Sequence, residues 1–535
     1  MKNLHRLLLA LASCLLLLPS LWAQTEPPNF LFVITDDMGV DYTNGYYLGS
    51  LRPNTPTLDR LRETGITFEN VFATPRCSPS RAAILSGKYG NKTGVLGTPG
   101  NLDTSHVSIF KALEAQTNGQ YADAVLGKWH ISSPADPQHP LDHGADYFMG
   151  VMGAMVGDYY AWERTENGQT TVDSTYVTTA LTDASIDWIN AQTQPWFLWL
   201  AHPAPHSPFH TPPSQLYTSS PPTDVVEQYV TMIEAVDTEL DRLLKNISDS
   251  ELDNTLIVFV GDNGTPSRPL QDYPRGRGKG TVYQGGIRVP LIISGARLSR
   301  QGERESALIH ITDLYATVLE LAGAELPGGI YNSLSFDHLL DNADGPTRDY
   351  NYSEQVNGGA NEYAIRGPQY KLIVSISEGT EEFYDLLNDS LEINDLLLGT
   401  LTEEQRRIKD DLEAEAQQIR QAWSCRDHIQ NGDEQGIDCG GTYCEPCLIS
   451  SAQEPMEQAV FHLFPNPSRE VLYIRSASSP IQGIRLMTAS GATLLSLEEV
   501  HSMEEVIDIS QLAPQLLFVE ISHAEGRVLR KMIKM

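Results

Sequence analysis

The stretch "NFLFVITDD" (residues 29–37) is the strongest guide to the fold of this chain. It is a continuous apolar run that ends in two carboxylates, as a strand buried on both faces of a parallel sheet does. Similar runs are "WFLWLAHPAPH" (196–206) and "TLIVFVGDNG" (255–264), and helix-like segments such as "PTLDRLRETG" (56–65) lie between them. The alternation predicts an α/β fold, in which ligands bind at the carboxyl ends of the strands.

The chain has 535 residues, which is more than one hydrophobic core usually takes, so several domains are expected. The α/β pattern extends over residues 25–344. Short alternating segments and an acidic helix over 345–424 predict a smaller antiparallel α+β subdomain. A cysteine-rich segment (425–447) and a strand-rich region (460–535) follow.

The first 23 residues have the composition of a signal peptide. A short basic start precedes an apolar run from Leu7 to Leu18, Pro19 breaks it, and Ala23 stands near a plausible cleavage point. The run is too short for a membrane span, so none is expected. Lipidation at Cys14, in "LASC", is the alternative to simple export.

The overall charge excludes one large class of partner. Against 37 Lys and Arg stand 69 Asp and Glu, a formal net charge of −32. Nucleic-acid binding needs a basic surface, so no nucleic-acid partner is expected. An anionic substrate would need a local site made from a metal ion or a few clustered cations.

Carboxylate and amide oxygens follow two of the predicted strands. Asp36 and Asp37 come after the first, and Asp262 and Asn263 come after "TLIVFV". Adjacent carboxylates at a strand end are unfavourable unless a cation neutralises them. Together the four residues form a hard-oxygen set suited to calcium or magnesium; ordinary loop or cap roles are the alternative.

Several cationic and imidazole side chains are candidates for chemistry. In "GKWH", Lys128 and His130 occupy alternate positions and are expected to share one face of an extended segment. Histidines also recur in a proline-stiffened loop, and cations gather after the second carboxylate pair. Surface, hydrogen-bonded or solvated-loop roles remain open for each of them: His202, His206, His210, Arg268, Arg275, Arg277, Lys279 and Arg288.

The stretch "TPRCSPSR" (74–81) holds Cys77, the only cysteine between Cys14 and Cys425. Together with five other short motifs, which are given below, this stretch makes residues 28 to about 395 resemble the type I sulfatases of the alkaline phosphatase superfamily. The resemblance implies an alkaline-phosphatase-like α/β sandwich with a large mixed, mostly parallel sheet and a smaller antiparallel α+β subdomain. The matching blocks are "TDD" (35–37), "CSPSR" (77–81), "GKWH" (127–130), "HPAPH" (202–206), "GDNG" (261–264) and "GKGTVYQGGIRVP" (278–290).

In that family a maturation enzyme oxidises the motif cysteine to formylglycine, an aldehyde. The resemblance implies that Cys77 is so modified and that its hydrate attacks sulfur. It also implies a divalent cation, calcium in preference to magnesium, held by Asp36, Asp37, Cys77, Asp262 and Asn263.

The same resemblance implies roles for the remaining site residues. Arg81 would orient the hydrated aldehyde, and Lys128 and Lys279 would bind the sulfate oxygens. His206 would protonate the leaving group, with Lys279 as its competitor. His130 would take the proton that accompanies release of sulfate.

The C-terminal region carries two further patterns. Cys425, Cys439, Cys444 and Cys447 are typical of two disulfides or of a zinc site, and an exported chain favours disulfides. From "FPNP" (464–467) onward the chain resembles the Bacteroidetes type IX secretion sorting domain. That resemblance implies an all-β domain, the type IX machinery as partner, and release or attachment at the cell surface. An ordinary accessory β domain is the alternative.

The function expected from these resemblances is a secreted sulfatase acting on a sulfated polysaccharide or oligosaccharide. One alternative is a phosphonate monoester or phosphodiester hydrolase on the same fold. The other is a catalytically silent surface protein that binds glycans. Gln284 stands where family members often have Glu, which leaves substrate specificity open.

Overall fold

Strand β1 (Asn29–Thr35) lies in the middle of a ten-stranded sheet in the computed structural model. It pairs in parallel with β7 (Trp196–His202) and with β8 (Thr255–Gly261). All seven residues of β1 are buried. The apolar side chains at even positions belong to one core and those at odd positions to another. The prediction of a strand buried on both faces is therefore confirmed.

The structure describes residues 27–327, 332–342, 345–424, 461–464, 471–476, 480–488, 493–510, 512–513, 515–523 and 526–534. The predicted signal peptide, the cysteine-rich segment and Pro465-Asn466-Pro467 lie outside these residues. The chain divides into two units, residues 1–447 and 448–535.

The large sheet of the first unit is mixed and mostly parallel, as predicted. Its strand order is β10-β2-β9-β8-β1-β7-β3-β4-β5-β6. The antiparallel pairs are β8 with β9, β2 with β9, β4 with β5 and β5 with β6. The other strands are β2 (Gly65–Phe72), β3 (Ala122–Lys128), β4 (Tyr147–Val151), β5 (Trp162–Glu166), β6 (Gln169–Asp173), β9 (Leu291–Gly295) and β10 (Glu303–His310).

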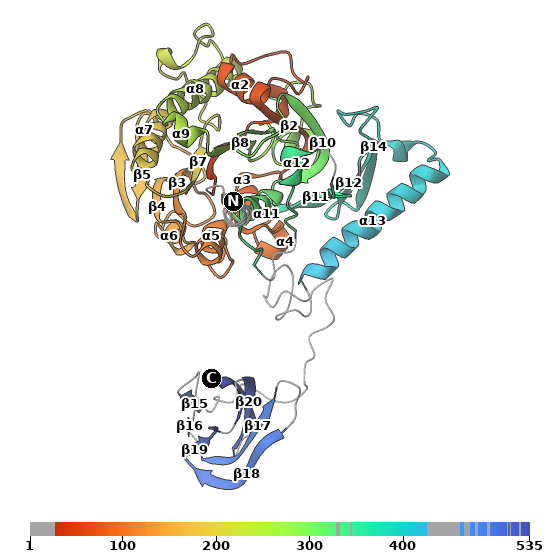
Figure 1. Ribbon diagram of the computed structural model, residues 1–535. Helices are drawn as coiled ribbons and strands as arrows, with labels where there is room; N and C mark the ends of the chain where they lie inside the picture. The colour runs from red at the N-terminus through yellow and green to blue at the C-terminus, as the bar shows by residue number, and fades with distance from the viewer. Residues whose placement is uncertain are drawn as a thin grey trace, which may run out of the picture. The chain divides into compact units, whose positions relative to one another are not determined.

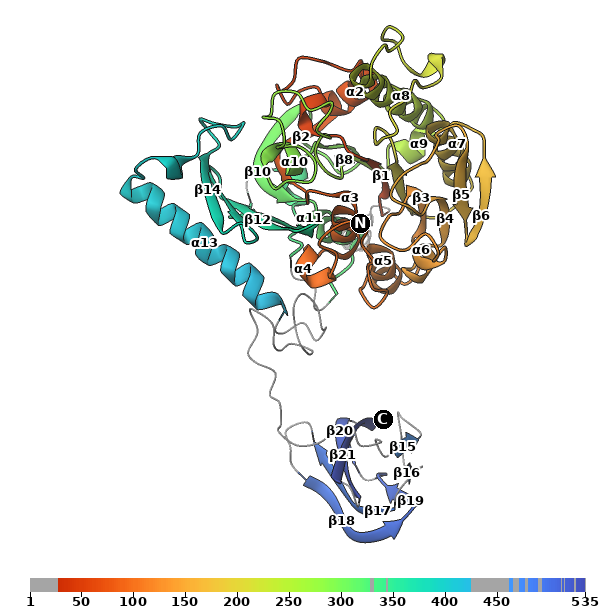
Figure 2. The ribbon, with the colours of Figure 1, turned by 180° about the vertical axis from the view of Figure 1, so that it is seen from behind.

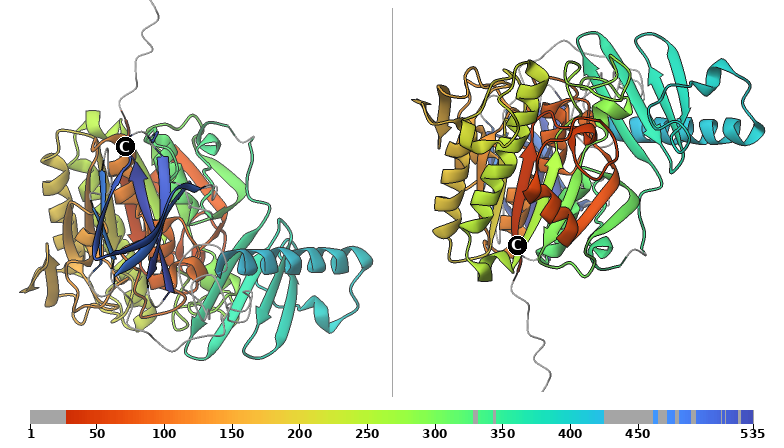
Figure 3. Two further views of the ribbon diagram at one scale, coloured as in Figure 1. Left: turned by 90° about the horizontal axis from the view of Figure 1, so that it is seen from below. Right: turned by 90° about the horizontal axis from the view of Figure 1, so that it is seen from above.

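Helices cover both faces of this sheet (Figures 1, 2 and 3). One core holds α3 (Cys77–Ser86), α5 (Ile109–Thr117) and α11 (Asp313–Leu321). The other core holds α2 (Pro56–Thr64), α7 (Val177–Asn190) and α8 (Val225–Lys245). Shorter helices are η1 (Val40–Tyr42), α4 (Gly90–Thr93), α6 (His139–Asp142), η2 (Ser214–Leu216), α9 (Asp249–Leu252), α10 (Gln284–Ile287), α12 (His338–Asp341) and η3 (Leu396–Leu398).

The antiparallel α+β part predicted after residue 345 is a four-stranded meander beside a long helix, α13 (Glu403–Ser424) (Figure 1). Apolar residues on one face of this sheet pack with Leu412 and Ala416 of α13. The other face packs against Val282 and Ile287. Both belong to residues 278–290, the segment that contains Lys279 and is called the site loop below. The strands are β11 (Asn351–Asn357), β12 (Ala360–Arg366), β13 (Tyr370–Ser375) and β14 (Thr380–Asp385).

A buried ion pair joins this sheet to the site loop. Lys371 Nζ lies 2.5 Å from Glu392 Oε1, and both side chains are fully buried. The same ammonium donates to the carbonyl of Val282 (2.8 Å), and Glu392 accepts from the backbone N–H of Gln284 (2.6 Å). The pair therefore fixes the backbone that follows Lys279.

We expect Lys371→Met to lower the free energy of unfolding of the first unit by about 3–5 kcal/mol, because it leaves Glu392 buried without its counter-charge. Tryptophan fluorescence in urea measures this for the first unit, since all seven tryptophans precede residue 448. Arg407→Met is the control, because Arg407 forms an exposed pair with Asp411. We expect that control to cost less than about 1 kcal/mol. Equal losses in both variants would show that the buried pair has no special weight.

Every secondary-structure element that the structure describes in the second unit is a strand, as predicted. One antiparallel sheet has the order β15-β16-β19 and the other β18-β17-β20-β21. Apolar side chains from both sheets form one core, which makes the unit a β-sandwich. The strands are β15 (Phe461–Phe464), β16 (Val471–Ser476), β17 (Ile481–Thr488), β18 (Thr493–Ser502), β19 (Glu504–Asp508), β20 (Gln515–His523) and β21 (Gly526–Lys534).

Candidate active site

Cys77 is the first residue of α3, and its side chain is buried. Its Sγ lies 3.1 Å from His130 Nδ1 and 3.7 Å from Lys128 Nζ. Burial raises the pKa of the thiol, although the charge of Lys128 opposes this. A protonated thiol is a weak nucleophile, so the unmodified side chain is poorly suited to attack.

The two predicted oxygen pairs, Asp36 with Asp37 and Asp262 with Asn263, lie close together at the carboxyl ends of neighbouring strands. β1 and β8 are parallel neighbours in which Thr35 pairs with Gly261, so the residues after each strand lie side by side. The N–H of Asp37 donates to Asp262 Oδ1 (3.1 Å), and Asn263 Nδ2 donates to Asp37 Oδ1 (2.8 Å). Asp37 has a φ of 71°, a left-handed conformation that a non-glycine residue adopts at a cost.

This cluster fits a divalent cation. Within the described part of the chain, Asp36 Oδ1 and Asn263 Oδ1 are buried and have no hydrogen-bond partner. Ligand atoms of Asp36, Cys77 and Asp262 all lie within 4.8 Å of one another. Burial and the charge of Asp36 raise the pKa of Asp262. A cation among these oxygens would satisfy the free acceptors and relieve the repulsion between the carboxylates.

Three cationic side chains surround the carboxylates. Arg81 donates to Asp262 Oδ2 through Nε (3.1 Å) and Nη2 (2.8 Å), and to the carbonyl of Lys128 through Nη1 (2.6 Å). Lys128 pairs with Asp36, and Lys279 pairs with Asp37. Against the effect of burial, Asp37 raises the pKa of Lys279, which therefore stays protonated.

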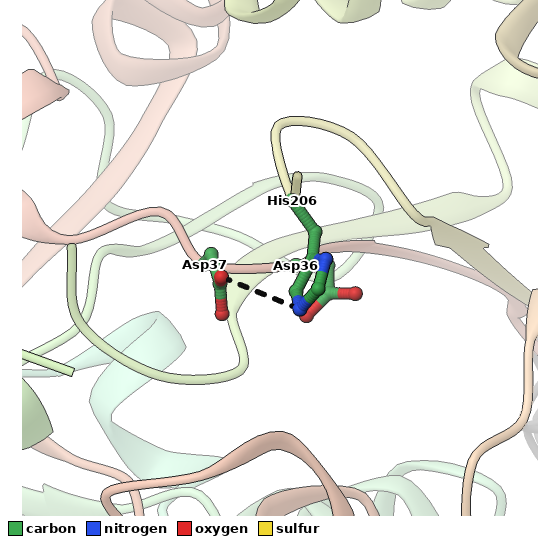
Figure 4. Close-up of side chains that lie close together, drawn as sticks. All are labelled: Asp36, Asp37 and His206. Carbon is green, nitrogen blue, oxygen red and sulfur yellow. Dashed lines mark ion pairs between the residues drawn. The ribbon is translucent and has the colours of Figure 1, made fainter. Parts of the chain in front are cut away.

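Two histidines also belong to the cluster: His130 contacts Cys77 and His206 approaches Asp37. His130 adopts a φ of 55°, and burial together with Lys128 lowers its pKa to about 2, so its ring is neutral. His206 Nε2 lies 3.7 Å from Asp37 Oδ2 (Figure 4). His206 Nδ1 donates to the carbonyl of Ser207 (2.8 Å), which directs Nε2 toward the carboxylates.

The structure thus brings together all the residues implied by the family resemblance, but it places other candidates elsewhere. His202 is buried at the end of β7, and His210 Nε2 contacts the hydroxyl of Tyr176 at 3.0 Å. Among the described residues, neither forms a hydrogen bond with Cys77. The remaining cations are also held apart: Arg277 pairs with Glu382, Arg288 donates to the carbonyl of Glu69, and Arg268 and Arg275 are exposed.

Sequence reasoning gave no role to Arg76 or Glu392. Arg76 precedes Cys77 and contacts Gln355, and Glu392 supports the loop after Lys279. Their partners lie 279 and 108 residues away in the chain. The sequence shows only that Arg76 is a cation directly before Cys77. A single arginine at such a position does not by itself indicate a role in binding.

Trp129, between Lys128 and His130, is anchored by a pair of histidines. Its Nε1 donates to His139 Nδ1 (3.0 Å). His139 Nε2 and His143 Nε2 both approach the carbonyl of Leu102, at 2.9 and 3.2 Å. His139 Nδ1 accepts from Trp129 and its Nε2–H donates to the carbonyl of Leu102, so the His139 imidazole is neutral. Burial lowers the pKa of His143 to about 4, so its ring is neutral at pH 7.

We expect His143→Asn to reduce the loss of stability between pH 6.5 and pH 4. In this window the unfolded chain protonates a histidine that the folded chain keeps neutral, so the folded state loses stability as pH falls. Removing that group should shrink the loss by up to about 3 kcal/mol. Urea unfolding at pH 7 and pH 4.5, followed by tryptophan fluorescence, measures the difference. An unchanged pH dependence in the variant would contradict a neutral His143.

Three family models match the chain. The model described as Sulfatase matches residues 28–324, more than half of the chain. The model described as N-sulphoglucosamine sulphohydrolase, C-terminal, matches residues 278–422. The model described as Secretion system C-terminal sorting domain matches residues 462–535 and indicates export, with attachment at the cell surface or release.

Curated relatives are named as sulfatases. The chain is 30% identical to N-acetylgalactosamine-6-sulfatase of Sus scrofa, over 56% of this chain and 63% of that protein. It is 27% identical to Arylsulfatase J of Mus musculus, over 57% and 54%. The chain therefore spans less than two thirds of these two relatives. N-acetylglucosamine-6-O-sulfatase of Bacteroides thetaiotaomicron is 24% identical, over 72% and 88%.

Solved structures share the fold. The crystal structure of Ps i-CgsB in complex with k-i-k-neocarrahexaose has a TM-score of 0.63 and 25% identity, covering 76% of this chain and 94% of that one. A structure in complex with D-glucosamine-2-N,6-O-disulfate has a TM-score of 0.63 at 23% identity, covering 74% and 98%. Among the helices in the described residues, none has the length and apolar character that crossing a membrane requires.

Proposed function

This chain belongs to the sulfatase family, and from that premise we propose that it hydrolyses sulfate esters outside the cell, with Cys77 as the precursor of its nucleophile. The observation that carries the proposal is the convergence on Cys77 Sγ of Lys128, His130 and the carboxylates Asp36 and Asp262. The cationic and imidazole groups around residue 77 suit an anionic ester, and they support a role for this position once its thiol has been converted.

Two groups that the chain does not supply by itself complete the proposed site. Formylglycine made from Cys77 by a maturation enzyme would provide a hydrated aldehyde as a nucleophile that regenerates after each turnover. A calcium ion held by Asp36, Asp37, Asp262, Asn263 and residue 77 would supply positive charge at the reacting oxygens.

The chain's own residues would do the rest. Lys128 and Lys279 would bind sulfate oxygens; in support, Lys128 Nζ lies 3.7 Å from Cys77 Sγ, and Lys279 pairs with Asp37 of the same carboxylate cluster. Arg81 holds Asp262 and the carbonyl of Lys128 and so fixes both sides of the site. Neutral His130 accepts a proton. His206 would donate a proton from Nε2 to the leaving oxygen in its protonated form, with the protonated Lys279 as its competitor.

The proposed substrate is a sulfated oligosaccharide or polysaccharide. Relatives named for the 6-sulfates of N-acetylgalactosamine and N-acetylglucosamine, and a structure in complex with a neocarrahexaose, support this class. Export through a type IX secretion machinery suits an extracellular polymer. The proposed domains are the catalytic α/β domain (25–344), the antiparallel α+β subdomain (345–424) and the sorting domain (460–535).

A screen of defined sulfated oligosaccharides, an aryl sulfate and a phosphodiester tests this proposal, using protein co-expressed with a maturation enzyme. We expect release of inorganic sulfate from at least one sulfated sugar. A strong preference for the phosphodiester would favour a phosphodiester or phosphonate hydrolase instead. No turnover of any ester, with glycan binding retained, would favour a silent binding protein.

A further inference from the structure

Arg76 stands out among the cations around Cys77 because it has no acidic partner. Arg81, Lys128 and Lys279 each pair with a carboxylate of the site. Among the described residues, no carboxylate lies within 4.0 Å of the Arg76 guanidinium; the hydrogen bond it makes is from Nε to Gln355 Oε1, at 3.3 Å.

The Arg76 side chain lies on the flank of the site formed by Gly280. Its Nη2 is 3.0 Å from the position that a Cβ on Gly280 would take, so a side chain at residue 280 would displace the guanidinium. Gly280 follows Lys279, which reaches Asp37 and is 17% exposed. Arg76 is itself partly exposed. The guanidinium therefore lies beside the solvent-facing part of the site rather than in its buried interior.

Gln355 fixes the orientation of this arginine. Its Oε1 accepts from Arg76 Nε, while its Nε2 donates to the carbonyl of Gly280 (2.7 Å) and to Glu362 Oε1 (2.5 Å). Glu362 thus lies beyond Gln355, where it holds the amide but does not neutralise the guanidinium. The two terminal nitrogens of Arg76 remain available, and they form the planar fork that suits a carboxylate or a sulfate.

We propose that Arg76 binds a second anionic group of the substrate, next to the sulfate ester that is cleaved. This inference rests on the proposed function. The ligand is a sulfated saccharide that carries a second sulfate or a uronic carboxylate. Cys77 and Lys128 would receive the scissile sulfate, and Arg76 would select saccharides with a further negative charge on the Gly280 side.

The test compares kcat/KM of wild type, Arg76→Met and Arg76→Lys on three sulfated saccharides: one with a single sulfate, one with two sulfates, and one with a single sulfate and a uronic acid. We expect Arg76→Met to lower the preference for at least one doubly charged substrate over the singly charged one by about tenfold or more, mainly through KM. The preference of Arg76→Lys for doubly charged substrates should lie between those of wild type and Arg76→Met. The two doubly charged substrates show whether the anion is a sulfate or a carboxylate.

Arg406→Met is the matched control, since Arg406 is exposed on α13 and its loss changes the net charge equally. Rates are divided by the fraction of converted Cys77, measured by mass spectrometry, because Arg76 adjoins the modification motif. An Arg76→Met preference within twofold of wild type for both doubly charged substrates would overturn the inference and leave the proposed function intact. Wild-type protein that hydrolyses no sulfate ester would overturn both.

Discussion

Cys77→Ala should abolish sulfate-ester hydrolysis, with kcat/KM reduced by at least about a thousandfold. Alanine removes the atom from which the nucleophile is made, and the residues around it can then only bind. Release of inorganic sulfate from an aryl sulfate measures the effect. Folding should be little affected, because alanine suits a helix and the hydrogen bonds lost are the weak ones of the sulfur with His130 and Lys128.

Cys77→Ser separates the nucleophile from the space that it fills. A serine hydroxyl is close to a thiol in size, but it is not the substrate from which formylglycine is made here, and it could attack without being able to expel sulfate afterwards. We expect at most a single stoichiometric event and no steady turnover. Steady turnover by Cys77→Ala, at a rate near that of wild type, would place the reaction elsewhere in the protein.

Removal of divalent cations should also abolish activity and lower the melting temperature of the first unit. Asp36, Asp37 and Asp262 lie together in a buried site, so loss of the proposed cation leaves their mutual repulsion opposed only by the neighbouring lysines and Arg81. We expect dialysis against a chelator to reduce activity by at least about a hundredfold. Calcium should restore activity better than magnesium does, because calcium accepts about six to eight oxygens in irregular geometry, whereas magnesium demands near-ideal octahedral geometry and usually keeps several waters.

Asp36→Asn is the matched variant for the metal experiment. Its melting temperature should respond less to the chelator than that of wild type, because one carboxylate ligand is gone. Metal content measured on the purified protein gives a readout that does not depend on turnover. A wild-type protein that keeps its activity and its melting temperature after its calcium and magnesium have been removed would contradict the metal site.

The fold was predictable from the sequence where burial requires a recognisable pattern of apolar residues. The run over residues 29–35 is apolar at every position because both of its faces are covered, and β7 and β8 show the same pattern. The hairpin of β5 and β6 has no such mark, since residues 169–172 of β6 are all exposed. Backbone pairing at the edge of the sheet holds it in place, and pairing partners are not encoded by periodicity.

The site was predictable to the extent that it follows from strand ends. Asp36 and Asp262 meet because β1 and β8 are parallel neighbours, and short motifs marked the residues around them. Contacts between distant segments were not predictable in this way. The hydrogen bonds of Arg76 to Gln355 and of Lys371 to the carbonyl of Val282 depend on how the four-stranded sheet packs beside the site loop. The same limit explains His202 and His210, whose loop was recognised while the directions of their side chains were not.

The most direct test of the central claim is the mass of the peptide that contains Cys77, taken from fully active protein. The account predicts that residue 77 is present as the aldehyde or its hydrate, and that the converted fraction rises and falls with specific activity. Unmodified cysteine at residue 77 throughout a preparation with full sulfatase activity would contradict it.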